Sequence, residues 1–182
     1  MAATLYTVGH GSRTIEELIG VLAEACIGTL VDVRAYPGSR RHPQFNQRAL
    51  EDALAARGIA YAWRGKALGG FRKAPPHSRH VALRVGAFRG FADYMETAEF
   101  ASALDAVLQE AGRAPLAIMC AEREPAQCHR SFIADAALAR GARVVHLIDG
   151  GERREARLNA AARMAGATLV YDAGQPRLLD DA

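Results

Sequence analysis

The local signals that indicate the fold class lie in Leu5-Tyr6-Thr7-Val8-Gly9-His10-Gly11-Ser12-Arg13-Thr14-Ile15-Glu16-Glu17. Its first four residues predict a buried strand, and the glycines that flank His10 permit a tight turn. Thr14 and Glu17 have the spacing of a capping box, which marks the start of a helix. A strand that passes directly into a capped helix is typical of an α/β protein.

The same alternation continues along the chain. Further strands are predicted over residues 29–34, 59–63, 115–119 and 143–148, and further helices over residues 46–57, 90–95, 97–110 and 130–140. In the first helix, Leu18, Leu22 and Cys26 repeat at helical spacing, so we expect Cys26 in the core and Gly28 at the helix end. Strands separated by helices favour a parallel sheet covered on both faces. We therefore predict a single three-layer, Rossmann-like α/β domain over residues 1–182.

Two segments depart from this rhythm. Residues 64–88 contain glycine, proline and arginine without a sustained period, which is typical of a lid or a binding loop. In the C-terminal part we expect a helix over residues 155–165 and a last strand over residues 168–171.

The composition excludes several classes of protein. A hydrophobic fraction of 50% and a charged fraction of 24% are ordinary for a globular domain. The N-terminus shows no basic region followed by an apolar run, and no apolar stretch is long enough to cross a bilayer, so we expect a cytoplasmic protein without membrane contact. Three cysteines are too few for a disulfide framework and are expected to be thiols, metal ligands or redox pairs.

Polar residues gather where three predicted strands end. Gly9 through Ser12 follow the first strand, Asp32 and Arg34 end the second, and the segment from Cys120 to Arg130 follows the fourth. Because ligands of open α/β sheets bind outside the carboxyl ends of the strands, we expect these segments to form one site.

The segment from Cys120 to Arg130 connects a strand to a helix. The start of a helix favours an anion and lowers the pKa of a nearby thiol. Histidine titrates nearest to neutral pH and is the usual proton carrier. The predicted roles are nucleophile for Cys120, anion binding for Arg34 and Arg130, proton carrier for His10 or His129, and acid or base for Glu122.

Structural alternatives stay open for the same residues. Buried cysteines are common, so Cys120 and Cys128 could simply pack in the core. Asp32, in an apolar strand, must be paired or protonated, and an ion pair with Arg34 or Arg130 would only fasten the site together.

Two further interpretations concern metals and nucleic acids. Cys120, Cys128, His129 and His10 could bind a metal, although seven residues separate the two cysteines, unlike the spacing of structural zinc sites. Basic residues at 40–41 and 72–89 are interleaved with Phe71, Phe88 and Phe91, as on a nucleotide-binding or nucleic-acid-binding face. A solvated charged loop is the alternative.

Several motifs together resemble the bacterial family of domain of unknown function 488. They are Thr7-Val8-Gly9-His10, residues 30–34 with Pro37 and Ser39-Arg40-Arg41, Pro43-Gln44-Phe45-Asn46, Leu68-Gly69-Gly70, residues 88–95, and Met119-Cys120-Ala121-Glu122 with Pro125 and Cys128-His129-Arg130. The resemblance covers residues 6–148 and leaves residues 149–182 as an extension. It implies that these motifs line one site and brings no activity, substrate or cofactor.

Two details qualify the resemblance. Family members commonly have Ser directly after Gly-His, whereas Gly11 intervenes here and the hydroxyl moves to Ser12. A weaker similarity links the chain to rhodanese-like and cysteine-phosphatase domains, but Arg130 lies ten residues after Cys120, where the phosphatase motif has six.

The sequence thus predicts a small thiol-dependent enzyme for sulfur or phosphoryl transfer on an anionic or nucleotide-like ligand. The residues predicted to bind this ligand are Gly9, Ser12, Asp32, Arg34, Arg40, Arg41, Gly69, Gly70, Cys128 and Arg130. The alternatives are a non-catalytic nucleotide-binding or nucleic-acid-binding domain, in which Arg40, Arg41, Arg72 and Arg79 contact phosphates, and a metal-binding protein. The sequence identifies neither a cofactor nor an oligomeric state.

Overall fold

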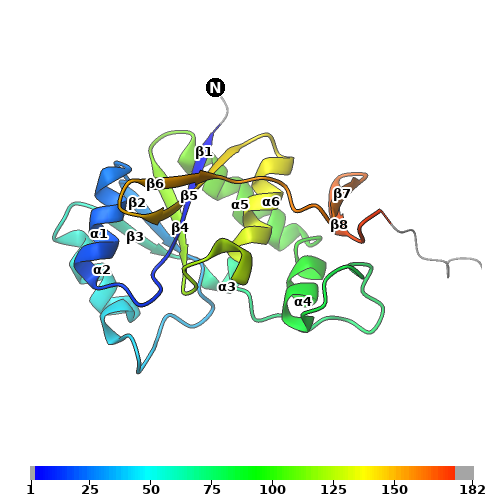
Figure 1. Cartoon of the computed structure of the whole chain (residues 1–182), viewed down its shortest axis with the longest axis horizontal. Helices are drawn as coiled ribbons and strands as arrows, with labels where there is room; N and C mark the ends of the chain where they lie inside the picture. The colour runs from blue at the N-terminus through cyan, green and yellow to red at the C-terminus, as the bar shows by residue number, and fades with distance from the viewer. Residues whose placement is uncertain (1–2, 175–182) are drawn as a thin grey trace, which may run out of the picture.

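A computed structural model describes residues 3–174 and contains a six-stranded sheet in the order β3-β2-β4-β1-β5-β6 (Figure 1). The strands are β1 (Thr4–Gly9), β2 (Thr29–Asp32), β3 (Ala60–Trp63), β4 (Leu116–Cys120), β5 (Arg143–Asp149) and β6 (Glu152–Glu155). Strands β1 to β5 are parallel, and β6 pairs antiparallel with β5. The predicted α/β class and the mostly parallel sheet are confirmed.

Helices pack against this sheet through two apolar clusters. The helices are α1 (Ile15–Glu24), α2 (Gln47–Ala55), α3 (Gly65–Leu68), α4 (Gly86–Tyr94), α5 (Ala98–Ala111) and α6 (Arg130–Ala139), with 3-10 turns η1 (Pro43–Phe45) and η2 (Pro125–Gln127). In β4, Leu116 and Ile118 join the cluster that contains α5 and α6, whereas Ala117 and Met119 join the cluster that contains α1 and α2. This strand is buried on both sides, as expected for a central parallel strand. The Rossmann-like three-layer arrangement stays a prediction.

Helix α1 begins as predicted and ends earlier. The capping box is present, because Thr14 Oγ1 accepts from the N–H of Glu17 and a Glu17 carboxylate oxygen accepts from the N–H of Thr14. The helix ends at Glu24, and Cys26, with φ of 54°, occupies the left-handed position that the sequence analysis assigned to Gly28. The N–H of Ile27 returns to the carbonyl of Leu22 (2.9 Å), as in a Schellman motif.

The core position predicted for Cys26 is therefore wrong, and its thiol is exposed. The apolar residue that follows explains the difference, because Ile27 is buried in the cluster beside α1. Burial of Ile27 sets the point at which the chain turns away from the helix.

The helix predicted over residues 155–165 is also wrong. The chain forms β6, crosses to β7 (Ala162–Ala165) and pairs it antiparallel with β8 (Thr168–Tyr171), which confirms the last predicted strand. The Tyr171 ring is buried 5.1 Å from that of Phe132, and its hydroxyl bonds to Asp135 on α6 (3.0 Å). These long-range contacts outweigh the helix propensity of the alanines in this segment.

Residues 64–88 are more ordered in secondary structure than the predicted loop. They include α3 and the start of α4, which begins at Gly86 rather than Gly90. The part between these helices is fastened to the domain, since the guanidinium of Arg72 lies 3.7 Å over the Tyr94 ring and the N–H of Ala82 donates to the carbonyl of Tyr171 (3.0 Å). Within residues 3–174, no helix combines the length and the apolar character needed to cross a membrane.

Candidate functional site

A cavity of about 400 Å³ opens where the carboxyl ends of β1, β2 and β4 meet. β4 lies between β2 and β1, so that Gly9 pairs with Cys120 and Asp32 pairs with Met119. The predicted site residues that line the cavity are His10, Arg34, Gly70, Cys120, Glu122, Cys128 and His129. A second cavity of about 740 Å³ between α6 and β6 touches none of them and shares only Phe88 with the first.

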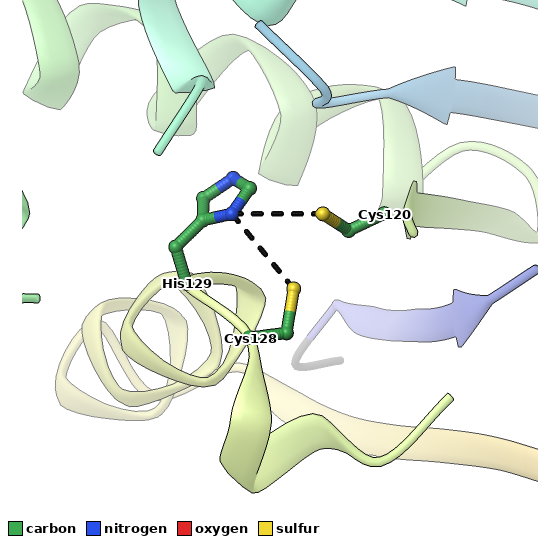
Figure 2. Close-up of side chains that lie close together, drawn as sticks. All are labelled: Cys120, Cys128 and His129. Carbon is green, nitrogen blue, oxygen red and sulfur yellow. Dashed lines mark hydrogen bonds between the residues drawn. The ribbon is translucent and has the colours of Figure 1, made fainter. Parts of the chain in front are cut away.

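Cys120, Cys128 and His129 form a compact group at this cavity (Figure 2). Cys120 ends β4, Cys128 follows η2, and His129 immediately precedes α6. Nδ1 of His129 lies 3.6 Å from Sγ of Cys120 and 3.8 Å from Sγ of Cys128. All three side chains are buried. We call this group the Cys-Cys-His centre.

The orientation of the His129 ring is set by its surroundings. Nε2 donates to the backbone carbonyl of Leu68 (3.0 Å), so Nδ1 faces the two sulfurs. The ring also packs against Gly70, where a Cβ would lie 2.6 Å from Cγ of the imidazole, and edge-on to Phe91 at 5.0 Å. Gly70, which was predicted to bind the ligand, lines the cavity and leaves room for this imidazole.

The two thiols of the centre have different proton affinities. The pKa of Cys128 is lowered to about 4, chiefly by the hydrogen bond from the Cys120 thiol, with further lowering by His129 and Arg130 against the opposing effect of burial. The pKa of Cys120 is raised well above its usual value by the same hydrogen bond and by burial. The N–H of Arg130 also donates to Sγ of Cys128 (3.5 Å). The geometry therefore favours Cys128 as the thiolate, where the sequence interpretation favoured Cys120.

Most hydrogen-bond donors of the Arg34 guanidinium bind acceptors within the protein. Its Nε donates to Oδ1 of Asp32 (2.9 Å) and its Nη2 to Oδ2 (2.6 Å) and to the carbonyl of Phe45 (2.8 Å). Tyr61 donates its hydroxyl to the same carboxylate (2.8 Å). The ion pair considered as the structural alternative for Asp32 is thus present, and Nη1 of Arg34 is left beside His10 (3.4 Å).

His10 is a neutral imidazole at neutral pH. Burial lowers its pKa to about 4, although the hydrogen bond to the Gly11 carbonyl acts in the opposite direction. Its Nδ1 donates to that carbonyl (2.9 Å), its Nε2 faces Arg34, and its ring stacks on Phe45 at 4.4 Å. Both nitrogens are engaged, which disfavours the predicted role as proton carrier.

Arg130 lies beneath the site and does not line the cavity. It is fully buried, with Nη1 donating to the carbonyl of Glu122 and Nη2 to that of Arg123 (2.6 Å). A Cβ at Gly9 would collide with the carbonyl of Glu122 and approach Nη1 of Arg130. Gly9 and Arg130 therefore hold the loop after β4 in place, and neither presents a polar group to the cavity.

The remaining predicted ligand-binding residues lie outside the lining. Ser12, Arg40 and Arg41 are exposed, and Gly69 is buried against Ala35. Glu122, the predicted acid or base, lines the cavity and is also exposed.

The sequence analysis missed Tyr36 at the cavity mouth. Tyr36 is 76% exposed and Phe71 is 79% exposed, their rings are 5.8 Å apart, and both line the cavity. The available signal was an aromatic residue beside Pro37 in the loop that follows β2. Two large apolar rings in water at the mouth of a cavity are typical of a surface that a ligand covers.

Comparison with known proteins gives one match. Residues 14–137 match the family described as "Domain of unknown function DUF488". No match was found among curated proteins or solved structures. The family expected from the motifs is confirmed, whereas the weaker similarity to rhodanese-like and cysteine-phosphatase domains stays a prediction.

Proposed function

We propose that this chain, which belongs to the DUF488 family, is a small cytoplasmic enzyme. It uses a cysteine thiolate to transfer a sulfur or phosphoryl group. The observation that carries the proposal is the placement of Cys128 at the cavity. Its sulfur accepts the N–H of Arg130 and lies beside the Cys120 thiol and the His129 imidazole. Hydrogen bonds from the start of a helix and from a neighbouring imidazole stabilise a thiolate over a thiol.

The proposed step is a displacement. The transferred atom is the sulfane sulfur of a persulfide or thiosulfonate donor, or the phosphorus of a phosphoryl donor. The Cys128 thiolate forms a bond to this atom while the bond from that atom to the leaving group breaks. The electron pair of the broken bond goes to the leaving group, which takes the proton of Cys120. An acceptor then attacks the persulfide or thiophosphate, releases the Cys128 thiolate and returns a proton to Cys120, so that no oxidant or reductant is consumed.

The cavity mouth supports an anionic or nucleotide-like ligand. Tyr36 and Phe71 offer aromatic faces on which a base could stack. Arg40 and Arg41 belong to the same loop as Tyr36, are exposed, and form no ion pair within residues 3–174. Their neighbours Ser39 and His42 line the cavity, which supports a contact of these arginines with a phosphate.

A purely nucleic-acid-binding role has weaker support. Of the four arginines expected to contact phosphates, Arg72 packs on Tyr94 and donates to the Lys66 carbonyl, and Arg79 pairs with Glu96 and Thr168. Only Arg40 and Arg41 stay free for a polyanion, so a salt titration with nucleic acid is expected to give a shallow slope.

The proposal is tested by brief iodoacetamide labelling across pH with peptide mass spectrometry. We expect the labelling rate of Cys128 to change less than about threefold between pH 8 and pH 5.5, because its pKa of about 4 keeps it a thiolate throughout. An ordinary thiol with a pKa of about 8.5 slows about 200-fold over this range. The pH profile is the readout, since burial limits the absolute rate.

N-acetylcysteine serves as the external control, and the Cys26→Ser variant removes the exposed thiol without touching the cavity. A Cys128 rate that falls with pH in parallel with N-acetylcysteine rejects the thiolate and with it the proposed chemistry.

A further inference from the structure

We infer that Cys120, Cys128 and His129 form a binding site for one soft divalent metal ion, with Zn²⁺ as the simplest occupant. In this state the two sulfurs are ligands rather than a nucleophile and its proton donor. A bound ion is a different role for these residues from the proposed thiol chemistry, and it has a separate readout, the binding of Co²⁺ or Zn²⁺.

The distances in the centre match a tetrahedral zinc site. With Zn–S of about 2.3 Å, Zn–N of about 2.0–2.1 Å and tetrahedral angles, a sulfur and a nitrogen ligand are about 3.6 Å apart. Nδ1 of His129 lies 3.6 Å and 3.8 Å from the two sulfurs. The three ligand atoms all lie within 4.8 Å of one another, and the side chains converge on one point (Figure 2).

The histidine is also prepared as a ligand. Metal-binding histidines usually donate their second ring N–H to a carbonyl or carboxylate, which orients the ring and selects the ligating nitrogen. Nε2 of His129 donates in this way to the carbonyl of Leu68 (3.0 Å), which leaves Nδ1 for the ion. Gly70 and Phe91 hold the ring from its sides, so little rearrangement is needed on binding.

The donor set selects the class of ion. Two thiolates and one imidazole suit Zn²⁺ and related soft ions, whereas Mg²⁺ and Ca²⁺ require oxygen ligands. The spacing of seven residues between the cysteines, which disfavoured a metal in the sequence analysis, is explained by the fold. Cys120 comes from the end of β4 and Cys128 from the approach to α6, so two elements supply the ligands in place of one tight turn.

The fourth position faces the cavity. All three side chains line it, and within residues 3–174 no further His, Cys, Asp or Glu joins the group, His10 included. Three protein ligands with one open position are typical of catalytic rather than structural zinc sites. A water or a ligand atom from the cavity would complete the tetrahedron, with Glu122 in the same lining.

Binding and thiol chemistry compete for the same sulfur. Both cysteines must be thiolates and Nδ1 of His129 must be unprotonated to bind the ion, so binding releases the proton held by Cys120 and any proton that Nδ1 shares with Cys128. A bound ion therefore protects Cys128 from alkylation.

The test uses the full chain, stripped with a chelator and then titrated with Co²⁺ or Zn²⁺. We expect one ion per chain by elemental analysis, and an absorption spectrum of tetrahedral cobalt with thiolate ligation. Zn²⁺ is expected to slow the iodoacetamide labelling of Cys128 more than tenfold, with reversal by chelator, while the labelling of Cys26 does not change. Protection is measured in the wild-type chain, so this result does not depend on the folding of a variant.

The His129→Asn variant is expected to bind Co²⁺ at least tenfold more weakly, with Cys26→Ser as the matched control that binds normally. Absence of a stoichiometric ion together with unprotected labelling overturns the metal site. The proposed thiolate survives that result if the pH profile stays flat. Conversely, an ion that protects Cys128 from alkylation supports the metal site even if metal-free Cys128 has the pH profile of an ordinary thiol. In that case the metal site stands and the proposed function is rejected.

Discussion

Two buried polar groups lie at the ends of the neighbouring strands β2 and β4, and they differ in what their polar atoms bind. At the end of β2, Asp32 and Arg34 are hydrogen-bonded to each other. Asp32 also accepts from the Tyr61 hydroxyl, and Arg34 also donates to the Phe45 carbonyl. On the side of β4, the two sulfurs of the Cys-Cys-His centre converge on a single nitrogen at the cavity. A polar residue at a strand end thus indicates function only if its polar atoms are not already hydrogen-bonded to other protein atoms.

Arg130 extends the comparison. It has the residue type and the position expected of an anion-binding group, yet it binds two backbone carbonyls beneath the site. We therefore assign Asp32, Arg34 and Arg130 mainly to stability and the Cys-Cys-His centre to chemistry. This division predicts that substitutions of the first group mainly reduce folding stability and that substitutions at the cavity mouth mainly reduce binding.

The largest effect is expected at Asp32. Asp32→Ala leaves the buried guanidinium of Arg34 without its partner, and loss of one member of a buried ion pair costs roughly 3–5 kcal/mol. Urea denaturation followed by circular dichroism measures the loss. The double variant Asp32→Ala with Arg34→Met is expected to recover part of the stability, because the uncompensated charge is gone. A loss below 1 kcal/mol for Asp32→Ala would contradict the assignment of this pair to stability.

The second effect concerns His10, whose folded pKa of about 4 lies below its unfolded value of about 6.5. Below pH 6.5 the unfolded chain binds a proton that the folded chain excludes, so stability falls as pH falls from 6.5 towards 4. One such group contributes a slope of about 1.4 kcal/mol per pH unit, or on the order of 3 kcal/mol in full.

His146 has a pKa of about 4 for the same main reason, burial, and burial also lowers the pKa of His80, so the wild type carries these contributions as well. Asp135 acts in the opposite direction between about pH 6 and pH 4, because burial raises its pKa to about 6. His10→Gln is expected to remove the His10 contribution from the pH dependence of unfolding, and NMR titration of the imidazole measures the pKa directly. A His10 that titrates near pH 6.5 would contradict its assignment to stability and would support the predicted role as proton carrier.

These cases show which parts of the site local sequence could predict. The alternation of strands and helices and the capping box at Thr14 depend on neighbouring residues, and they were predicted correctly. The end of α1 depends on burial of Ile27, and the C-terminal hairpin depends on contacts of Tyr171 with α6. Such tertiary contacts are not encoded in the periodicity of the segment itself.

The site shows the same limit. The strand ends predicted correctly which segments meet, since the carboxyl ends of parallel strands share one edge of the sheet. The proton distribution between Cys120 and Cys128 depends chiefly on the hydrogen bond between these two side chains, which lie eight residues apart in the sequence. The exposure of Tyr36 depends on the course of a loop. Both features required the three-dimensional arrangement.

The third effect is expected at Gly9, which belongs to the stabilising group with Arg130. Gly9→Ala places a methyl group against the Glu122 carbonyl, and overpacking of this kind typically costs roughly 1–3 kcal/mol. Gly20→Ala is the matched control, because nothing lies within 4 Å of its added Cβ. Since Gly20 lies within α1, the control is expected to gain about 0.5–1 kcal/mol. Equal thermal stability of the two variants would show that the loop after β4 moves freely.

The smallest effect on folding is expected at the cavity mouth. Phe71→Ala and Tyr36→Ala remove side chains that are mostly exposed, so their stability should stay within about 0.5 kcal/mol of wild type. Binding is expected to respond much more, because stacking of a base on an aromatic ring contributes roughly 1–3 kcal/mol, which corresponds to a loss of affinity of about 5- to 150-fold.

Calorimetric titration with each of the four nucleoside monophosphates measures this loss, and Met164→Ala, an exposed apolar residue of β7, serves as the control. We expect the cavity-mouth variants to lose affinity for the nucleotide while their free energy of unfolding is unchanged. Asp32→Ala is expected to show the opposite pattern, with a lower free energy of unfolding as its main effect. If Phe71→Ala and Met164→Ala bind the nucleotides equally well, the Phe71 ring does not contact the ligand. The distinction between residues that stabilise the fold and residues that act on a ligand then depends on the Cys-Cys-His centre alone.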